Sequence, residues 1–157
     1  MKALIVYYSQ SGNVKWASEA LGKELDATLL PLIPKKEYPN KGFRKFFVGG
    51  GAALLKKKPA LKPYEANLSE YDLIVLADPV WNARVAPPIL TFLKENDLKG
   101  KKVALMLSSG SGNAEKAFKE LKKILKENPI AELSLKNPLQ SQEESKKQIA
   151  EFAVKLK

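Results

Sequence analysis

The residues best suited to chemistry lie in the run Tyr-Ser-Gln-Ser-Gly-Asn at positions 8–13, between an apolar stretch and a segment of helical periodicity. A turn that leads from a strand into a helix directs backbone N–H groups and the positive end of the helix dipole at one place, where a phosphate binds well. Ser9 and Ser11 can donate hydroxyls to that place. Gly12 permits close approach of the chain, and Asn13 can cap the helix. The run predicts a phosphate site, with a plain serine-rich turn as the alternative.

A second cluster follows another apolar stretch and reads Asp-Pro-Val-Trp-Asn-Ala-Arg at positions 78–84. Trp81 comes directly after a strand end, where an exposed indole is commonly a contact for a ligand or partner. The alternative is that Trp81 folds back onto the helix that begins near Pro88. Asn82 is one of the few residue types other than glycine that tolerate a positive φ. We predict an aromatic platform in the loop 78–86.

A third cluster, Ser-Ser-Gly-Ser-Gly-Asn at positions 108–113, carries no bulky side chain. It offers backbone N–H groups and hydroxyls to the edge of a planar polar group, or it is a plain flexible turn. A phosphate cradle, an aromatic platform and a donor-rich glycine loop together fit a flat heteroaromatic ring that carries a phosphorylated tail.

The apolar pattern predicts which elements position these clusters. Strands are expected at 2–8, 27–33, 71–77, 102–107 and 131–135, with Pro31 placing the second at an edge. Helices are expected at 13–25, 42–57, 87–96 and 113–125, and a last one after a capping box of Ser141 and Glu144.

The alternation of strands and helices predicts one α/β domain over residues 1–157: a three-layer, doubly wound, five-stranded parallel sheet. In such sheets ligands bind beyond the carboxyl ends of the strands. All three clusters follow strand ends, so we expect them to meet at one edge of the sheet.

Composition narrows the chemistry. The chain has no cysteine and no histidine, which excludes disulfides, thiolate and imidazole catalysis and nearly all zinc, copper or iron–sulfur sites. No segment resembles a signal peptide or a membrane span, so a cytoplasmic location is expected.

The net charge is +10, and segment 35–62 holds nine basic residues and one acidic residue. This basic segment is either a solvated surface, a docking patch for an acidic protein, or a nucleic-acid or lipid surface, the last being the least favoured.

The sequences of these clusters and of the strands before them resemble those of a known family. Segments 8–13, 71–81 and 101–110 make the chain similar to short-chain flavodoxins over its whole length. The resemblance implies a flavodoxin-like fold with strand order 2-1-3-4-5 and noncovalently bound FMN, the phosphate in the first loop and the isoalloxazine between the second and third. The implied cofactor contacts are Ser9, Gln10, Ser11, Gly12, Asn13, Val14, Pro79, Val80, Trp81, Asn82, Ala83, Arg84, Ser108, Ser109, Gly110 and Gly112.

The chain also departs from the family pattern. Ser11 and Val14 stand where flavodoxins usually have threonine, which removes one phosphate-facing hydroxyl at Val14. Asp78 would repel a phosphate and is expected to point elsewhere. Asn82 takes the place of a glycine whose peptide, in the family, rotates to accept a hydrogen bond from N5 of the reduced flavin. The third loop lacks the aromatic residue that many flavodoxins place over the ring, so one ring face is either bare or covered by Tyr38 or a phenylalanine of the basic segment.

The function implied is electron transfer between redox partners by an FMN protein that is strongly basic, whereas typical flavodoxins are acidic. Positive charge from Arg84 and the lysines would favour an anionic reduced flavin and raise its reduction potential. The first alternative is an enzyme, an NAD(P)H-dependent FMN or quinone reductase on the same fold. The second is a docking module without FMN, which Val14 and Asp78 would favour.

Overall fold

Five parallel strands form the central sheet of the computed structural model, which describes residues 1–38 and 58–157. Their order is β2-β1-β3-β5-β6, which confirms the predicted order of the five-stranded parallel sheet. A short additional strand, β4, pairs antiparallel with the end of β3. The strands are β1 (Ala3–Tyr7), β2 (Thr28–Pro31), β3 (Leu73–Trp81), β4 (Arg84–Val85), β5 (Lys102–Ser109) and β6 (Ala131–Lys136).

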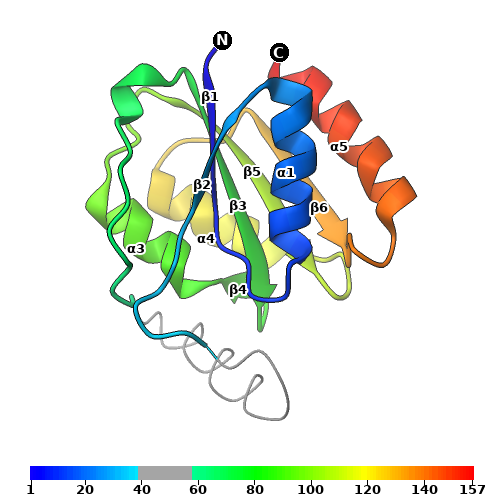
Figure 1. Cartoon of the computed structure of the whole chain (residues 1–157), viewed down its shortest axis with the longest axis horizontal. Helices are drawn as coiled ribbons and strands as arrows, with labels where there is room; N and C mark the ends of the chain where they lie inside the picture. The colour runs from blue at the N-terminus through cyan, green and yellow to red at the C-terminus, as the bar shows by residue number, and fades with distance from the viewer. Residues whose placement is uncertain (39–57) are drawn as a thin grey trace.

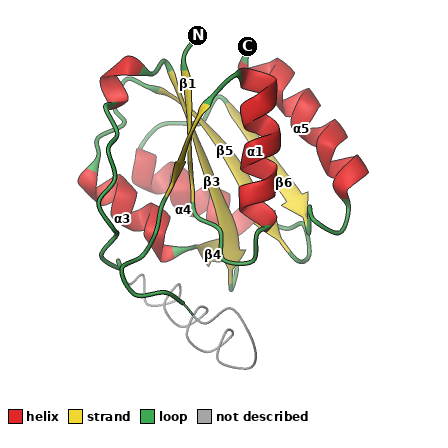
Figure 2. Cartoon of the chain, in the orientation of Figure 1, coloured by secondary structure: helices red, strands yellow, loops and turns green. Residues whose placement is uncertain are grey.

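Helices cover both faces of the sheet, so that the chain forms three layers (Figure 1). Helices α1 and α5 pack on one face, and α3 and α4 pack on the other. Figure 2 shows the same layering by secondary structure, with the sheet between the two helical layers. The helices are α1 (Asn13–Leu25), α3 (Pro87–Glu95), α4 (Glu115–Leu125) and α5 (Gln142–Leu156), with a 3₁₀ turn, η2 (Leu68–Glu70).

The core lies on both sides of the sheet, because side chains along a strand alternate between its faces. In β1, Leu4 and Val6 belong to the cluster under α3 and α4, whereas Ala3 and Ile5 belong to the cluster under α1 and α5. A strand buried on both faces reads as an unbroken apolar run, which is how the sequence indicated β1, β3 and β5.

The second strand lies at an edge of the sheet. It pairs only with β1 among the described strands, and its last residue is Pro31, as the sequence predicts. Beyond it, Pro34 forms an antiparallel bridge with Leu61. The helix expected at 42–57 and most of the basic segment lie outside the described residues.

Two predicted helix caps are wrong. The cap residue of α1 is Gly12, and Asn13 is its first helical residue. Ser141 does precede α5, but its hydroxyl donates to the carbonyl of Lys136 at 2.7 Å and forms no capping bond. Asn13 bonds to Leu139 N, and Ser141 bonds to the carbonyls of Lys136 and Asn137, so neither side chain caps the backbone of the helix that follows. Among the described helices, none has the length and apolarity to cross a membrane.

The carboxyl ends of β1, β3 and β5 lie together at the end of the sheet that is opposite the two chain termini (Figure 1). The three predicted clusters lie at these strand ends, the second and third beginning within β3 and β5, and therefore lie along one end of the sheet.

Candidate functional site

The first loop builds a nook with unsatisfied donors at the start of α1. Gly12 has a φ of 89°, and its carbonyl accepts the first helical bond from Trp16 N at 2.9 Å. The amides of the residues between them have no partner within the helix. Ser9 Oγ is buried and has no hydrogen-bond partner among the described residues. Such a nook suits an anion that accepts several hydrogen bonds at once.

Other side chains of the first loop support the turn. Asn13 donates from Nδ2 to Ser11 Oγ at 3.1 Å, and its Oδ1 accepts from Leu139 N at 3.1 Å. Gln10 is half-buried beside Ser9. Val14, a predicted cofactor contact, has its side chain in the core under α1, so only its backbone can face an anion.

The loop between β6 and α5 belongs to the same edge, and the sequence reasoning missed it. Asn137 has a φ of 41°, and its Nδ2 donates to Gly110 O at 3.3 Å. Leu139 N bonds to Asn13, so this loop ties the first cluster to the third. The available signal was its position, since it too follows the carboxyl end of a predicted strand.

The second cluster is a β-hairpin, where the sequence predicted a loop. Strand β3 continues through Pro79 and Val80 to Trp81, and Trp81 pairs with Arg84. Between them Asn82 and Ala83 have φ values of 51° and 62°, the two left-handed residues of a tight hairpin turn. The positive φ expected at Asn82 is confirmed. The one at Ala83 was not foreseen, because alanine rarely adopts it.

Replacing Ala83 with glycine is therefore expected to raise the free energy of unfolding by about 1 kcal/mol, because glycine adopts a positive φ without steric cost. The control is Ala20 in the middle of α1, where glycine should lower the free energy of unfolding by a similar amount, about 1 kcal/mol. Urea denaturation of both variants measures the two effects. Equal losses in both variants would contradict the left-handed turn.

Trp81 lies in an aromatic cluster. Its ring centroid is 5.6 Å from that of Tyr8 and 5.0 Å from that of Tyr38, in edge-to-face geometry. The indole is half-buried, so it does not stand free in solvent. Burial raises the pKa of Tyr8, and the carboxyl of Asp78 raises it further. The cluster provides aromatic surface next to the first loop.

Of the two charged residues of the hairpin, Asp78 agrees with the sequence expectation and Arg84 differs from it. Asp78 is fully buried and points away from the nook, as expected, with Oδ2 accepting from Ala86 N at 2.6 Å. Arg84 NH1 lies 3.5 Å from Glu120 Oε1, so a carboxylate balances its positive charge. Arg84 therefore supplies less positive potential than its charge alone implies.

The third cluster begins inside β5. Ser108 and Ser109 belong to the strand, and Ser108 is buried and paired with Pro79. Gly112 has a φ of 80°, and its carbonyl accepts from Ser134 Oγ at 2.6 Å. The second and third clusters share a pocket of about 420 Å³, which is lined by Val80, Ala83, Ser109, Gly110, Ser111, Asn113, Ala114, Glu115 and Lys116. The tertiary structure thus brings the hairpin and the glycine loop together.

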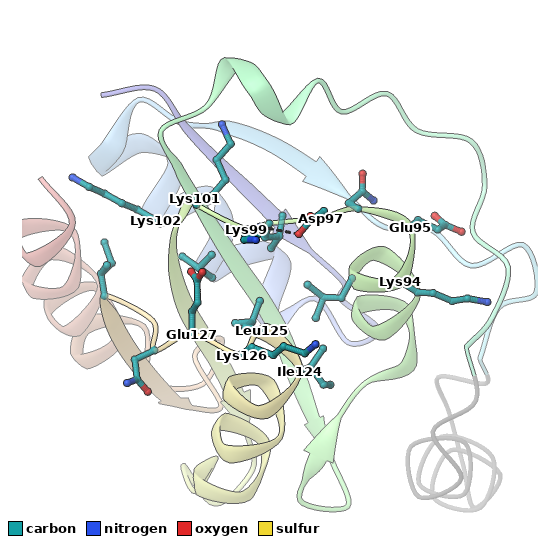
Figure 3. A pocket seen from close by; sticks show the side chains of 17 residues that line it. Lys94, Glu95, Asp97, Lys99, Lys101, Lys102, Ile124, Leu125, Lys126 and Glu127 are labelled. Carbon is teal, nitrogen blue, oxygen red and sulfur yellow. Dashed lines mark hydrogen bonds between the residues drawn. The ribbon is translucent and has the colours of Figure 1, made fainter.

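A wider depression of about 930 Å³ lies at the opposite end of the sheet, near the start of β5 (Figure 3). Lys94, Lys101 and Lys102 point away from one another there, as the figure shows. Side chains that do not converge form no site for a small ligand, so size alone does not identify the functional cavity.

A family model described as "Flavodoxin" matches residues 2–152, and the chain belongs to this family. A protein from Bacteroides eggerthii assigned as a flavoprotein is 28% identical, with a TM-score of 0.73 over 87% of this chain and 88% of its own. A flavoprotein from Lactobacillus acidophilus, solved in complex with FMN, is 22% identical, with a TM-score of 0.73 over 90% of this chain and 97% of its own.

An azoreductase from Bacillus anthracis has the same fold at 16% identity, with a TM-score of 0.50 over 99% of this chain and 98% of its own. The fold therefore occurs in an enzyme as well as in flavodoxins. No curated protein matches the chain.

Proposed function

We propose that the chain binds FMN noncovalently and carries electrons between redox partners. The observation that carries this proposal is the first loop, where buried Ser9 Oγ has no partner in the described part of the chain and Gly12 precedes a helix whose first amides are free of helical bonds. A phosphate monoester would satisfy these donors together. Membership of the flavodoxin family supports the same cofactor.

The remaining candidate residues have distinct tasks in this proposal. The phosphate is held by the amides and hydroxyls of residues 9–14. The ring lies between the hairpin 79–84 and the third loop, where Ser109, Gly110 and Gly112 offer polar groups to its edge. Trp81 supplies apolar aromatic surface and limits water. When bound, the flavin supplies the redox chemistry, and the protein adjusts its potential through contacts and charge.

Titration of the purified protein with FMN and with riboflavin tests the cofactor. We expect the bound flavin to be retained on desalting, and FMN to bind at least about 100-fold more tightly than riboflavin, because only FMN carries the charged phosphate. Equal affinity for the two would reject the phosphate nook. A protein that stays colourless would instead support the docking module without FMN.

Rapid mixing with NADPH separates the carrier from an NAD(P)H-dependent reductase. The observation that favours the enzyme is the pocket beside the glycine loop, because the residues that line it include no aromatic side chain to cover a ring. Fast bleaching of the flavin would establish the reductase. No reduction by NADPH, together with reduction by a protein partner, would establish the carrier.

The partner of a carrier is expected to be acidic and to dock near the basic segment 35–62. Lys35, Lys36, Lys58 and Lys62, the described lysines of this segment, are all exposed. Charge of one sign accelerates encounter with a partner of the other sign, and salt weakens the effect. An electron-transfer rate that falls as salt is added would support this docking mode.

Replacing Ser9 with alanine is expected to weaken FMN binding about tenfold, because the phosphate loses one hydrogen bond to a charged group. The apoprotein should lose no stability, since the hydroxyl has no partner among residues 1–38 and 58–157 without a ligand. Ser18 is the matched control, because its Oγ is also buried with no partner in these ranges but lies further along α1. Ser18→Ala should leave the FMN dissociation constant unchanged. Equal weakening in both variants would show that Ser9 does not contact the phosphate.

A further inference from the structure

Two carboxylates hold three consecutive residues at the return of the hairpin. Glu120 Oε1 lies 3.5 Å from Arg84 NH1, and Glu120 Oε2 accepts from Val85 N at 3.4 Å. Asp78 Oδ2 accepts from Ala86 N at 2.6 Å. Asp78 comes from β3 and Glu120 from α4, so two separate elements grip the same short segment.

The hairpin needs such support. Strands β3 and β4 pair at only two positions, and isolated two-stranded hairpins are marginally stable. The turn between them also holds Ala83 in the left-handed region, a conformation that persists only where the surroundings impose it. Loss of the carboxylate contacts would leave little to define the turn.

The two carboxyl groups are buried at a cost. Asp78 is fully buried and the side chain of Glu120 is 10% exposed. Burial raises the pKa of Asp78 well above its usual value; the N–H of Ala86 opposes this shift and the charge of Glu120 adds to it. An apolar side chain at position 78 would avoid this cost. Core packing alone therefore does not account for the pair, whereas its grip on the hairpin does.

We propose that Asp78 and Glu120 are positioning residues, which hold the turn at Trp81, Asn82 and Ala83 in the conformation that receives the flavin. Glu120 acts through Arg84 and Val85, and Asp78 acts through Ala86. This role rests on the proposed function, since the turn is a flavin contact only if FMN binds.

The protonation state of Asp78 should affect how this residue holds the hairpin. The groups that face its carboxyl are Glu120 from α4, Tyr8 at the end of β1 and the N–H of Ala86, with Arg84 beyond Glu120. Ionisation of Asp78 places a second negative charge next to Glu120, and the two charges repel each other. Because both carboxyl groups hold the hairpin, FMN affinity of the wild type should fall as pH rises, relative to a variant that cannot ionise at this position.

The decisive experiment compares wild type, Glu120→Gln and Glu132→Gln by FMN titration, visible circular dichroism of the bound flavin and urea denaturation. Glu132, in β6, pairs with Lys122 of α4 at 2.8 Å, so it is a carboxylate that binds the same helix without a recorded ion pair to the described hairpin, and it is the matched control. We expect Glu120→Gln to weaken FMN binding about tenfold and to change the dichroism, with Glu132→Gln like the wild type. Wild-type binding in Glu120→Gln, or equal weakening in both, would overturn the role of Glu120.

Asp78→Asn tests the second carboxyl, because asparagine still accepts from Ala86 N but does not ionise. Its FMN affinity should match the wild type at low pH, where Asp78 is protonated, and exceed it increasingly as pH rises. Parallel affinity curves for the two proteins would overturn the role of Asp78.

If the wild type itself binds no FMN, the proposed function is rejected. The positioning of the turn by Glu120 is then tested in the apoprotein. Amide resonances of Asn82 and Ala83 should shift in Glu120→Gln and remain in place in Glu132→Gln. Unshifted resonances in Glu120→Gln would overturn the positioning role.

Discussion

Replacing Ser11 with aspartate is expected to lower FMN affinity by more than about 100-fold, because two like charges about 4 Å apart near a protein surface repel by about 4 kcal/mol. The same variant should fold normally. Ser11 is exposed, and an aspartate there can still accept the bond that Asn13 donates. Its carboxylate would also lie near the positive end of α1, which should raise the free energy of unfolding by about 0.5 kcal/mol. Fluorescence titration and urea denaturation measure the two opposite effects.

Ser11→Asn separates charge from shape. Asparagine has the size of aspartate and no charge, so this variant should bind FMN within about threefold of the wild type. Wild-type affinity in Ser11→Asp would place the phosphate away from the first loop. Equal losses in the aspartate and asparagine variants would instead indicate a steric effect.

Replacing Asp78 with asparagine is expected to raise the free energy of unfolding by about 2 kcal/mol at alkaline pH, because a buried carboxylate with one unpaired oxygen is costly. The second oxygen, Oδ1, has no partner among the described residues, whereas Oδ2 bonds to Ala86 N. Asparagine keeps an acceptor for Ala86 and needs no charge. Urea denaturation across a pH series measures the gain.

The sign of the pH dependence follows from the raised pKa of Asp78 in the folded protein. Between its ordinary pKa and the raised one, the folded state holds a proton that the unfolded state has released. Wild-type stability therefore falls over this window as pH rises, while the asparagine variant does not share the loss. The advantage of Asp78→Asn should be small in acid and should grow with pH.

Asp97→Asn is the control, because Asp97 also accepts one backbone N–H, from Lys99, but is exposed. It should not reproduce the pH-dependent gain. A constant difference between Asp78→Asn and the wild type at every pH would contradict the burial of an ionisable group at position 78.

Much of the fold could be predicted from local pattern. Apolar runs of strand length alternate with segments of helical period, and this alternation admits few arrangements other than a doubly wound parallel sheet. Pro31 indicated the edge strand, and Pro87 with Pro88 indicated the start of α3. The turn at positions 8–13 predicts a phosphate site, since glycine and hydroxyl residues between a strand and a helix leave donors without partners.

Local pattern did not predict the hydrogen-bond partner of a side chain that can bond to more than one group. Asn13 and Ser141 are both good capping residues, yet Asn13 accepts from Leu139 N in the loop between β6 and α5, and Ser141 donates to Lys136 O at the end of β6. The hairpin was missed because its turn, at Asn82 and Ala83, has no glycine to mark it.

The sequence by itself determined the class of fold and the kind of ligand, and it predicted the loops that hold this ligand, because these depend on residue type and periodicity over short stretches. Only the tertiary structure decided how those loops are held. Glu120 reaches Arg84 from another element, and Leu139 reaches Asn13 from the far end of the chain. Such contacts depend on how separate elements pack, and no local preference of either partner specifies them.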